Sequence, residues 1–139
     1  MAISIREMTI GDYPRLYSLW EKTPGIGLSD ADAGENIAQF LDRNPGMSFT
    51  AFDGDTLVGA VLCGNDGRRG YIHHLAVADT HRRKGIGGKL VGECLKKLRE
   101  NNIHKCHLFV FVDNQGAIDF WEKVGWEQRG DLLLMSKYT

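Results

Sequence analysis

The segment Arg82–Lys89 (RRKGIGGK) combines basic residues with glycines and is the part of the chain best suited to bind an anion. Its glycines let the backbone approach a ligand with the N–H groups turned outward. A helix that begins near Gly85 would add a partial positive charge at its N-terminus, and Arg82, Arg83 and Lys84 add full charges. These features predict a cradle for a diphosphate. The alternative is a basic helix cap whose glycines serve close packing.

Two other phosphate-binding motifs do not match this segment. A Walker loop requires glycine at position 83 and Ser or Thr after the Gly-Lys pair, whereas the chain has Arg83 and Leu90 there. A dinucleotide-binding fingerprint requires its third glycine at position 90, which is again leucine. The segment therefore indicates a diphosphate site outside these two classes.

The composition of the chain is that of one ordinary globular domain spanning residues 1–139. Hydrophobic residues make up 42% and charged residues 25% of the 139 residues, and the formal net charge is −1. This charge argues against nucleic-acid or membrane partners. Binding of RNA or DNA is a weak alternative, because no aromatic platform interleaves with the basic residues that would carry it. Those residues are Arg68, Arg69, Arg82, Arg83 and Lys84.

Targeting signals and cysteine usage favour a cytoplasmic protein. No apolar run approaches the roughly 20 residues of a membrane-spanning helix, and the N-terminus has no basic region followed by an apolar core. The cysteines Cys63, Cys94 and Cys106 form no CxxC pair, so we expect buried thiols in a reducing compartment. His104 and His107 beside Cys106 do not predict a metal site, because adjacent strand residues face opposite ways.

Hydrophobic periodicity and turn residues predict alternating strands and helices along the whole chain. The expected strands lie around Ile3 and Ile5 and over Ser48–Phe52, Leu57–Leu62, Tyr71–Val77 and Cys106–Val112. The last of these is almost continuously apolar, which predicts a central strand. The expected helices follow capping residues Thr9 and Ser29 and cover Gly85–Asn101 and 115–124. The tail Trp126–Tyr138 is expected to form two short strands divided at Gly130-Asp131.

Two segments of the chain resemble motifs of the GNAT superfamily of acetyltransferases. Residues 75–91 (LAVADTHRRKGIGGKLV) resemble the cofactor motif of the family, in which a strand ending L-x-V precedes Q/R-x-x-G-x-G/A. Residues 114–126 (NQGAIDFWEKVGW) resemble its Asn-x-x-Ala-x-x-Phe-Tyr-x-x-x-Gly-Phe segment. The resemblance implies a small single-domain bacterial member with the acyl-CoA N-acyltransferase fold. That is an α/β fold with a mixed, mostly antiparallel sheet, whose splayed central strands are flanked by helices.

The resemblance also implies acetyl-CoA as co-substrate, with no metal. The pantetheine arm would lie along the backbone of Leu75, Ala76 and Val77, and a backbone N–H near Val77 would polarise the thioester carbonyl. Backbone N–H groups of the cradle would hold the pyrophosphate. The implied cofactor contacts beyond the strand are Arg82, Arg83, Lys84, Gly85, Ile86, Gly87, Gly88, Lys89, Asn114, Ala117, Phe120 and Trp121.

The catalytic groups that the family usually carries are absent from the matching positions. A frequent glutamate base falls on Tyr71 or Phe109, and a frequent tyrosine acid falls on Trp121. His73 and His74 are the replacements, because an imidazole with a pKa of about 6.5 can accept a proton near neutral pH.

Neighbouring residues of a strand point to opposite faces, so only one of these histidines should face the cofactor groove. His73 shares its parity with Tyr71 and is the first choice, with His74 second. The alternative is that both are packing or surface histidines.

The activity implied is direct transfer of an acetyl group from the thioester to a primary amine of a small molecule, peptide or protein. A non-catalytic acyl-CoA-binding module, acting as a sensor or partner subunit, is the alternative that the missing carboxylate and tyrosine leave open. Asp30 and Asp32 would attract a cationic amine or be ordinary first-turn helix charges. A homodimer formed through the tail strands would follow the habit of the family. The expected walls of the acceptor site are Trp20, Ile26, Phe109 and Phe111.

Overall fold

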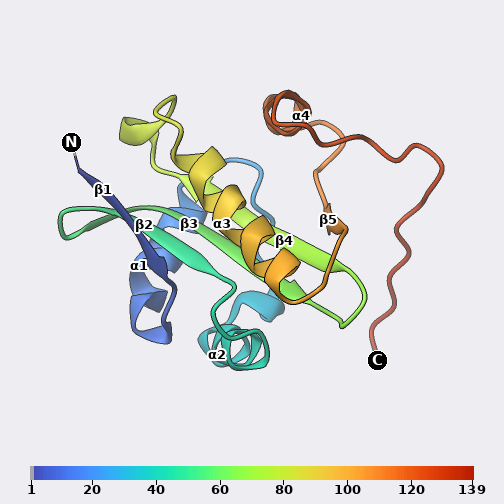
Figure 1. Cartoon of the computed structure of the whole chain (residues 1–139), viewed down its shortest axis with the longest axis horizontal. Helices are drawn as coiled ribbons and strands as arrows, with labels where there is room; N and C mark the ends of the chain where they lie inside the picture. The colour runs from blue at the N-terminus through green and yellow to red at the C-terminus, as the bar shows by residue number, and fades with distance from the viewer. Residues whose placement is uncertain (1) are drawn as a thin grey trace. The chain divides into compact units, whose positions relative to one another are not determined.

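The computed structural model describes residues 2–139 and divides the chain into two compact units. The first unit ends at Phe109, and the second consists of residues 110–139. All five strands and the helices α1, α2 and α3 belong to the first unit, and α4 belongs to the second (Figure 1). The expected alternation of strands and helices is therefore confirmed for the first unit.

The sheet of the first unit is mixed and mostly antiparallel, as expected. Its strands lie in the order β1-β2-β3-β4-β5. The pairs from β1 to β4 are antiparallel, and β5 runs parallel to β4. The strand bounds are β1 Ile3–Glu7, β2 Phe49–Asp53, β3 Thr56–Asn65, β4 Gly70–Val77 and β5 Cys106–Leu108.

The prediction of a long central strand over Cys106–Val112 is wrong. β5 ends at Leu108 and forms an edge of the described sheet. Its pairing with β4 stops at Ile72 opposite Leu108, so residues beyond it have no ladder to hold them extended. β4 itself continues to Val77, so the two strands part after three registered pairs.

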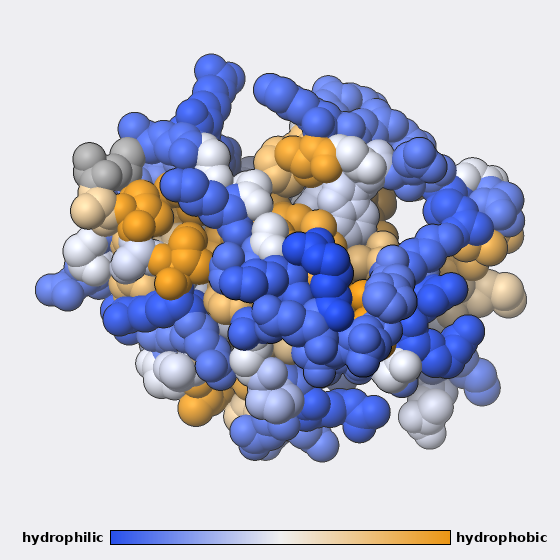
Figure 2. All heavy atoms as spheres, viewed as in Figure 1, coloured by the Kyte–Doolittle hydropathy of each residue, from blue (hydrophilic) through white to orange (hydrophobic). Residues whose placement is uncertain are grey.

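Helices cover both faces of this sheet. The helices α1 (Tyr13–Glu21) and α2 (Gly34–Arg43) pack on the face to which Ala60 of β3 points, around a buried cluster that includes Trp20. The preceding residue, Gly59, points the other way. A Cβ placed on it would lie 3.2 Å from side chains of α3 (Ile86–Glu100), which therefore covers the opposite face. Hydrophilic side chains cover most of the centre of Figure 2, where α3 crosses the sheet in the same view.

The two expected capping boxes both exist, but each begins a short 3-10 turn. Thr9 precedes the turn Ile10–Asp12, and α1 follows directly. Ser29 precedes the turn Asp30–Asp32, and α2 starts two residues later. The side chain of Asp32 accepts a hydrogen bond from the backbone N–H of Ser29 at 3.0 Å. The second capping box therefore fixes Asp32 at the entrance to α2.

The second unit contains α4 (Gln115–Lys123), close to the expected range. Asn114 caps this helix by accepting a hydrogen bond from the backbone N–H of Ala117 at 3.2 Å. The two strands expected over Trp126–Tyr138 are not formed in the structure, so that prediction is wrong. Leu133 is 90% exposed there, since the unit offers the tail no strand to pair with.

Candidate functional site

Strand β4 contains a bulge at His74 that decides which side chains face α2. Leu62 is registered with His73 and Ala60 with Ala76, so one residue of β3 stands opposite two of β4. His74 has a φ of 52°, a left-handed value that is uncommon for residues other than glycine. Both histidines line the same pocket, so the strict alternation on which the choice between them rested does not hold at this point of the strand. Simple alternation does not hold through a bulge, because the extra residue shifts its phase.

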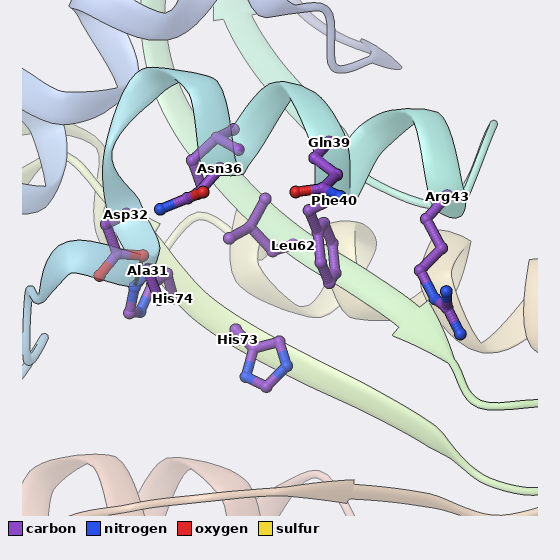
Figure 3. A pocket seen from close by; sticks show the side chains of 10 residues that line it. Ala31, Asp32, Asn36, Gln39, Phe40, Arg43, Leu62, His73 and His74 are labelled. Atoms are coloured by element: carbon purple, nitrogen blue, oxygen red, sulfur yellow. Dashed lines mark hydrogen bonds and ion pairs between the residues drawn. The ribbon is translucent and has the colours of Figure 1, made fainter. Parts of the chain in front are cut away.

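The pocket lies between β4, α2 and the turn before α2, and has a volume of about 580 Å³ (Figure 3). Its apolar lining comes from Ala31, Ile37, Phe40 and Leu62, and its polar lining from Asp32, Asn36, Gln39, Arg43, His73 and His74. In Figure 3 the side chains of Asp32 and His74 lie near one end of α2 and Arg43 near the other. Phe40 and His73 lie between them.

The imidazole of His74 is held in place by its neighbours. Its Nε2 lies 2.8 Å from Oδ1 of Asp32, a residue that is 5% exposed. The ring of Trp20 packs edge-on against it, with ring centroids 5.1 Å apart. The backbone carbonyl of Asp32 accepts a hydrogen bond from the hydroxyl of Tyr13 at 2.6 Å. Asp32 is therefore more than a first-turn charge, since it ties the entrance of α2 to the bulge of β4.

Among residues 2–139 His73 has no such hydrogen-bond partner, and its imidazole lies among aromatic rings. Its ring centroid is 6.1 Å from that of Phe40 and 6.4 Å from that of Tyr71, whose plane is 5° from parallel to it. Burial lowers the pKa of His73 below its usual value, and the neighbouring His74 lowers it further. His73 is therefore neutral at pH 7 and can accept a proton from a group in the pocket.

Sequence reasoning missed the contribution of α2 to this pocket. Asn36, Gln39, Phe40 and Arg43 line it together, and none of them was a candidate. Their spacing of i, i+3, i+4 and i+7 places them on one helical face. That spacing is a signal in the sequence that could have identified them.

The predicted cradle lies at the N-terminus of α3. Gly85 caps the helix with a φ of 78°, a conformation that glycine adopts without strain. The backbone N–H of Lys89 donates to the carbonyl of Gly85 at 3.1 Å. The N–H groups of the first turn, Ile86, Gly87 and Gly88, precede this bond and have no partner within the helix. A diphosphate fits such a terminus, because free N–H groups and the helix dipole both favour an anion.

The basic residues of the cradle differ in what they contact. The guanidinium of Arg82 lies 2.9 Å from Oδ1 of Asp79, and its Nε donates to the carbonyl of Val77 at 3.2 Å. Arg82 therefore holds the loop that leads out of β4. Arg83 and Lys84 are exposed at the surface beside it. Their charges are available to an anion at the helix terminus.

The expected acceptor walls lie mostly outside the pocket. Trp20 is 1% exposed and sits behind His74, and Ile26 packs half-buried against the core. Phe109 is 58% exposed, with its ring centroid 6.4 Å from that of Tyr71. Phe111 belongs to the second unit, as do the four expected cofactor contacts Asn114, Ala117, Phe120 and Trp121.

Residues 2–139 show neither a cluster of metal ligands nor a membrane-spanning helix. No group of three or more His, Cys, Asp or Glu side chains in this range could hold a metal ion. None of the helices described there is long and apolar enough to cross a membrane.

Comparison with known sequences gives a family match. A family model described as the acetyltransferase (GNAT) family matches residues 13–126. An acetyltransferase of Sodalis glossinidius is 29% identical over 97% of this chain and 94% of its own length. An acetyltransferase of Pectobacterium atrosepticum is 30% identical over 90% of this chain and 88% of its own length. An N-alpha-acetyltransferase 30 of Schizosaccharomyces pombe is 35% identical over 63% of this chain and 61% of its own length.

Solved structures share the fold. The PaiA N-acetyltransferase of Thermoplasma acidophilum, crystallised with coenzyme A, superposes with a TM-score of 0.82 at 21% identity. The match covers 94% of each chain. Ard1 of Thermoplasma volcanium superposes with a TM-score of 0.79 at 25% identity, over 90% of this chain and 82% of that one.

Proposed function

This chain belongs to the GNAT family of acetyltransferases, and from that premise we propose that it transfers an acetyl group from acetyl-CoA to a primary amine. Support for acetyl-CoA comes from the cradle at α3 and from the similar fold that was crystallised with coenzyme A. Support for a nitrogen acceptor comes from the resemblance to an N-alpha-acetyltransferase. The family match spans both units, which supports one N-acetyltransferase domain over residues 1–139.

The observation that carries the proposal is the path of β4. Its bulge presents His73 and His74 to the pocket, and the strand then runs from Leu75 through Val77 into the loop before the cradle. Pairing with β5 has stopped by this point, so the backbone of β4 borders a gap on that side within the described sheet. A donor held along this gap and an acceptor in the pocket would meet at the bulge.

The cradle and β4 would bind different parts of acetyl-CoA. The N–H groups of Ile86, Gly87 and Gly88 would bind the pyrophosphate, and the backbone from Leu75 to Val77 would pair with the pantetheine amides. When bound, acetyl-CoA supplies an acetyl thioester whose acyl group passes to the amine and whose thiol leaves. Asn114, Ala117, Phe120 and Trp121 remain proposed contacts from the second unit.

A backbone N–H of β4 would stabilise the negative charge that develops on the thioester oxygen. Val77 is the candidate. The N–H of Ala78 donates to the carbonyl of Val58 at 2.8 Å, so the adjacent pair of Val77 and Gly59 is not hydrogen-bonded and the N–H of Val77 points away from β3.

His73 is the better of the two histidines for accepting the proton of the amine. An alkylammonium has a pKa near 10.4, so only about one molecule in a thousand is neutral at pH 7, and a base accelerates the reaction. Burial keeps His73 neutral, and its ring borders the pocket. The imidazole of His74 is engaged with Asp32 and orients the bulge instead. Tyr71 stacks on His73 and positions its ring.

The test is release of coenzyme A from acetyl-CoA in the presence of a panel of primary amines. The expected result is amine-dependent release, with the N-acetylated amine identified by mass spectrometry. Tight binding of acetyl-CoA without turnover on any amine would instead favour the binding module that holds acyl-CoA as a sensor or partner subunit. Failure to bind acetyl-CoA at all would overturn both functions.

A further inference from the structure

The charges that line the pocket are unequally available to a ligand. Both carboxylate oxygens of Asp32 are engaged, Oδ1 with Nε2 of His74 at 2.8 Å and Oδ2 with the N–H of Ser29 at 3.0 Å. Asp32 is also buried, so it has no free face for a cationic group. The guanidinium of Arg43 is the opposite case, since residues 2–139 give it no ion pair or hydrogen bond within normal distances. The open charge of the pocket is therefore positive.

The position of Arg43 relative to His73 sets a length for the ligand. The rings of Phe40 and His73 lie side by side, with centroids 6.1 Å apart. Arg43 follows Phe40 by three residues, which is roughly 5 Å along the helix axis at 1.5 Å per residue. Figure 3 shows Arg43 beyond Phe40 on the same side of α2 as His73. With the reach of an arginine side chain, an anion bound by Arg43 would lie roughly 5–10 Å from His73.

The space between these two groups is apolar. Ile37 and Leu62 are buried beneath it, and the ring of Phe40 forms its side toward α2. Gln39, one residue before Phe40, adds an amide that can donate to the same anion. An apolar segment joining an amine to an anion would therefore meet matching groups along its whole length.

We propose that the acceptor is a primary amine that carries a carboxylate several bonds from its nitrogen. Arg43 binds the carboxylate, the apolar segment lies along Phe40, and the nitrogen lies beside His73. This assignment rests on the proposed function, because it uses His73 as the base. An α-amino acid is too short, since its nitrogen and carboxylate are only about 3 Å apart and cannot reach both groups. A diamine of the same length is disfavoured, because its second charge would face Arg43.

A matched pair of acceptors tests the assignment. The amines 6-aminohexanoate and hexylamine share the same reacting nitrogen and apolar chain and differ in the carboxylate. We expect kcat/KM for 6-aminohexanoate to exceed that for hexylamine by about tenfold, the usual contribution of a charge-assisted pair in partial contact with water. Glycine should be a poor acceptor. Triglycine also has a terminal amine and a carboxylate that are well separated. Comparing its kcat/KM with that of 6-aminohexanoate shows whether the acceptor is a peptide or an ω-amino acid.

Substitutions at Arg43 supply the decisive comparison. In Arg43→Gln the preference for 6-aminohexanoate over hexylamine should fall about tenfold, and Arg43→Lys should restore most of it. Arg99→Gln is the matched control, because Arg99 is an exposed arginine in the last turn of α3, on the other face of the sheet. Equal preference for both amines in the unaltered protein, or an unchanged preference in Arg43→Gln, would overturn the assignment.

A binding measurement separates failure of this assignment from failure of the proposed function. The N-acetylated product 6-acetamidohexanoate and its uncharged analogue N-hexylacetamide are titrated by calorimetry into the protein with coenzyme A present. Tighter binding of the carboxylate in the unaltered protein, lost in Arg43→Gln, supports the assignment even if no amine is acetylated. Equal binding of the two compounds overturns it, whatever the turnover.

Discussion

Nε2 of His74 lies 2.8 Å from Oδ1 of Asp32, and this contact joins the entrance of α2 to the bulge of β4. The side chains of the two residues are 17% and 8% exposed. A buried polar group that loses its partner costs about 1–3 kcal/mol. We therefore expect Asp32→Ala and His74→Ala each to lower the free energy of unfolding by about that amount.

A double-mutant cycle in urea measures how strongly these two residues are coupled. The expected coupling energy is about 1–2 kcal/mol, as for other groups in direct contact. His81 and Asp53 provide a matched control, since their side chains are 16% and 37% exposed and lie 2.9 Å apart. A coupling energy no larger than that of the control pair would show that the buried contact does not stabilise the bulge.

The second prediction concerns His73 as the base. Because burial lowers the pKa of His73, kcat/KM of the unaltered protein should fall on acidification with an apparent pKa below about 6.5. His73→Gln should lower kcat/KM by about 10²- to 10⁴-fold and abolish this acid limb. Tyr71→Phe is the control, because it keeps the stacked ring and should change kcat/KM only a few-fold. If kcat/KM of His73→Gln still falls on acidification with the same apparent pKa, another group accepts the proton of the amine.

The same shift predicts how stability depends on pH. The pKa of His73 is lower in the folded protein than the value of about 6.5 expected for the unfolded chain. Between these two values the unfolded chain binds more protons, so the free energy of unfolding falls as the pH decreases below about 6.5. Urea unfolding at several pH values should therefore show a steeper acid decline for the unaltered protein than for His73→Gln. Parallel curves for the two proteins would contradict this prediction.

A fourth prediction tests the cradle through Gly85. Its φ of 78° is costly for a β-branched residue, and a valine side chain would stand beside the free N–H groups of α3. Gly85→Val should therefore abolish binding of acetyl-CoA at micromolar concentrations, as measured by calorimetry. Gly46→Val is matched for strain, with a φ of 74° and open space around a Cβ, and should leave acetyl-CoA affinity unchanged. Micromolar affinity retained in Gly85→Val would rule the cradle out.

A fifth prediction tests how α2 is held over β3. A Cβ on Gly64 would lie 2.7 Å from the side chain of Asn44, whose Oδ1 accepts from the N–H of Asn65 at 3.0 Å. Gly64→Ala should displace this side chain and lower the free energy of unfolding by about 1–3 kcal/mol. Gly92→Ala, in open space on α3, should instead be neutral or stabilising by up to about 1 kcal/mol. Equal stability of the two variants would show that Asn44 moves aside without cost.

The sequence predicted the helices well because their signals are local. The buried residues of α3, which recur at helical spacing, and both capping residues, Thr9 and Ser29, lie within a few positions of the structure they specify. β5 and the tail were misjudged because pairing depends on a distant partner. The apolar run after Leu108 has the composition of a buried strand, but the register with β4 ends there.

The candidate site was predicted only in part, for the same physical reason. The cradle is a contiguous segment, so its glycines and basic residues could be recognised together. The pocket brings together residues of α2, β4 and the turn at Asp32, and only the bulge makes them neighbours. A left-handed φ at His74 has no signature in the sequence, since it is imposed by the pairing of β4 with β3 and by Asp32.

The bulge of β4 also limits how this site can change by mutation. Removing His74 would restore simple alternation and leave the pairs that follow unchanged, because Leu75 would then stand alone opposite Val61 and Ala76 would still stand opposite Ala60. The imidazole that pairs with Asp32 would be lost, and of the two histidines only His73 would still line the pocket. The extra residue of the bulge therefore adds a polar side chain to the pocket without altering how Ala76 and Val77 pack. A change of acceptor can arise through substitutions on the pocket face of α2, which leave both the base and the core of the strand in place.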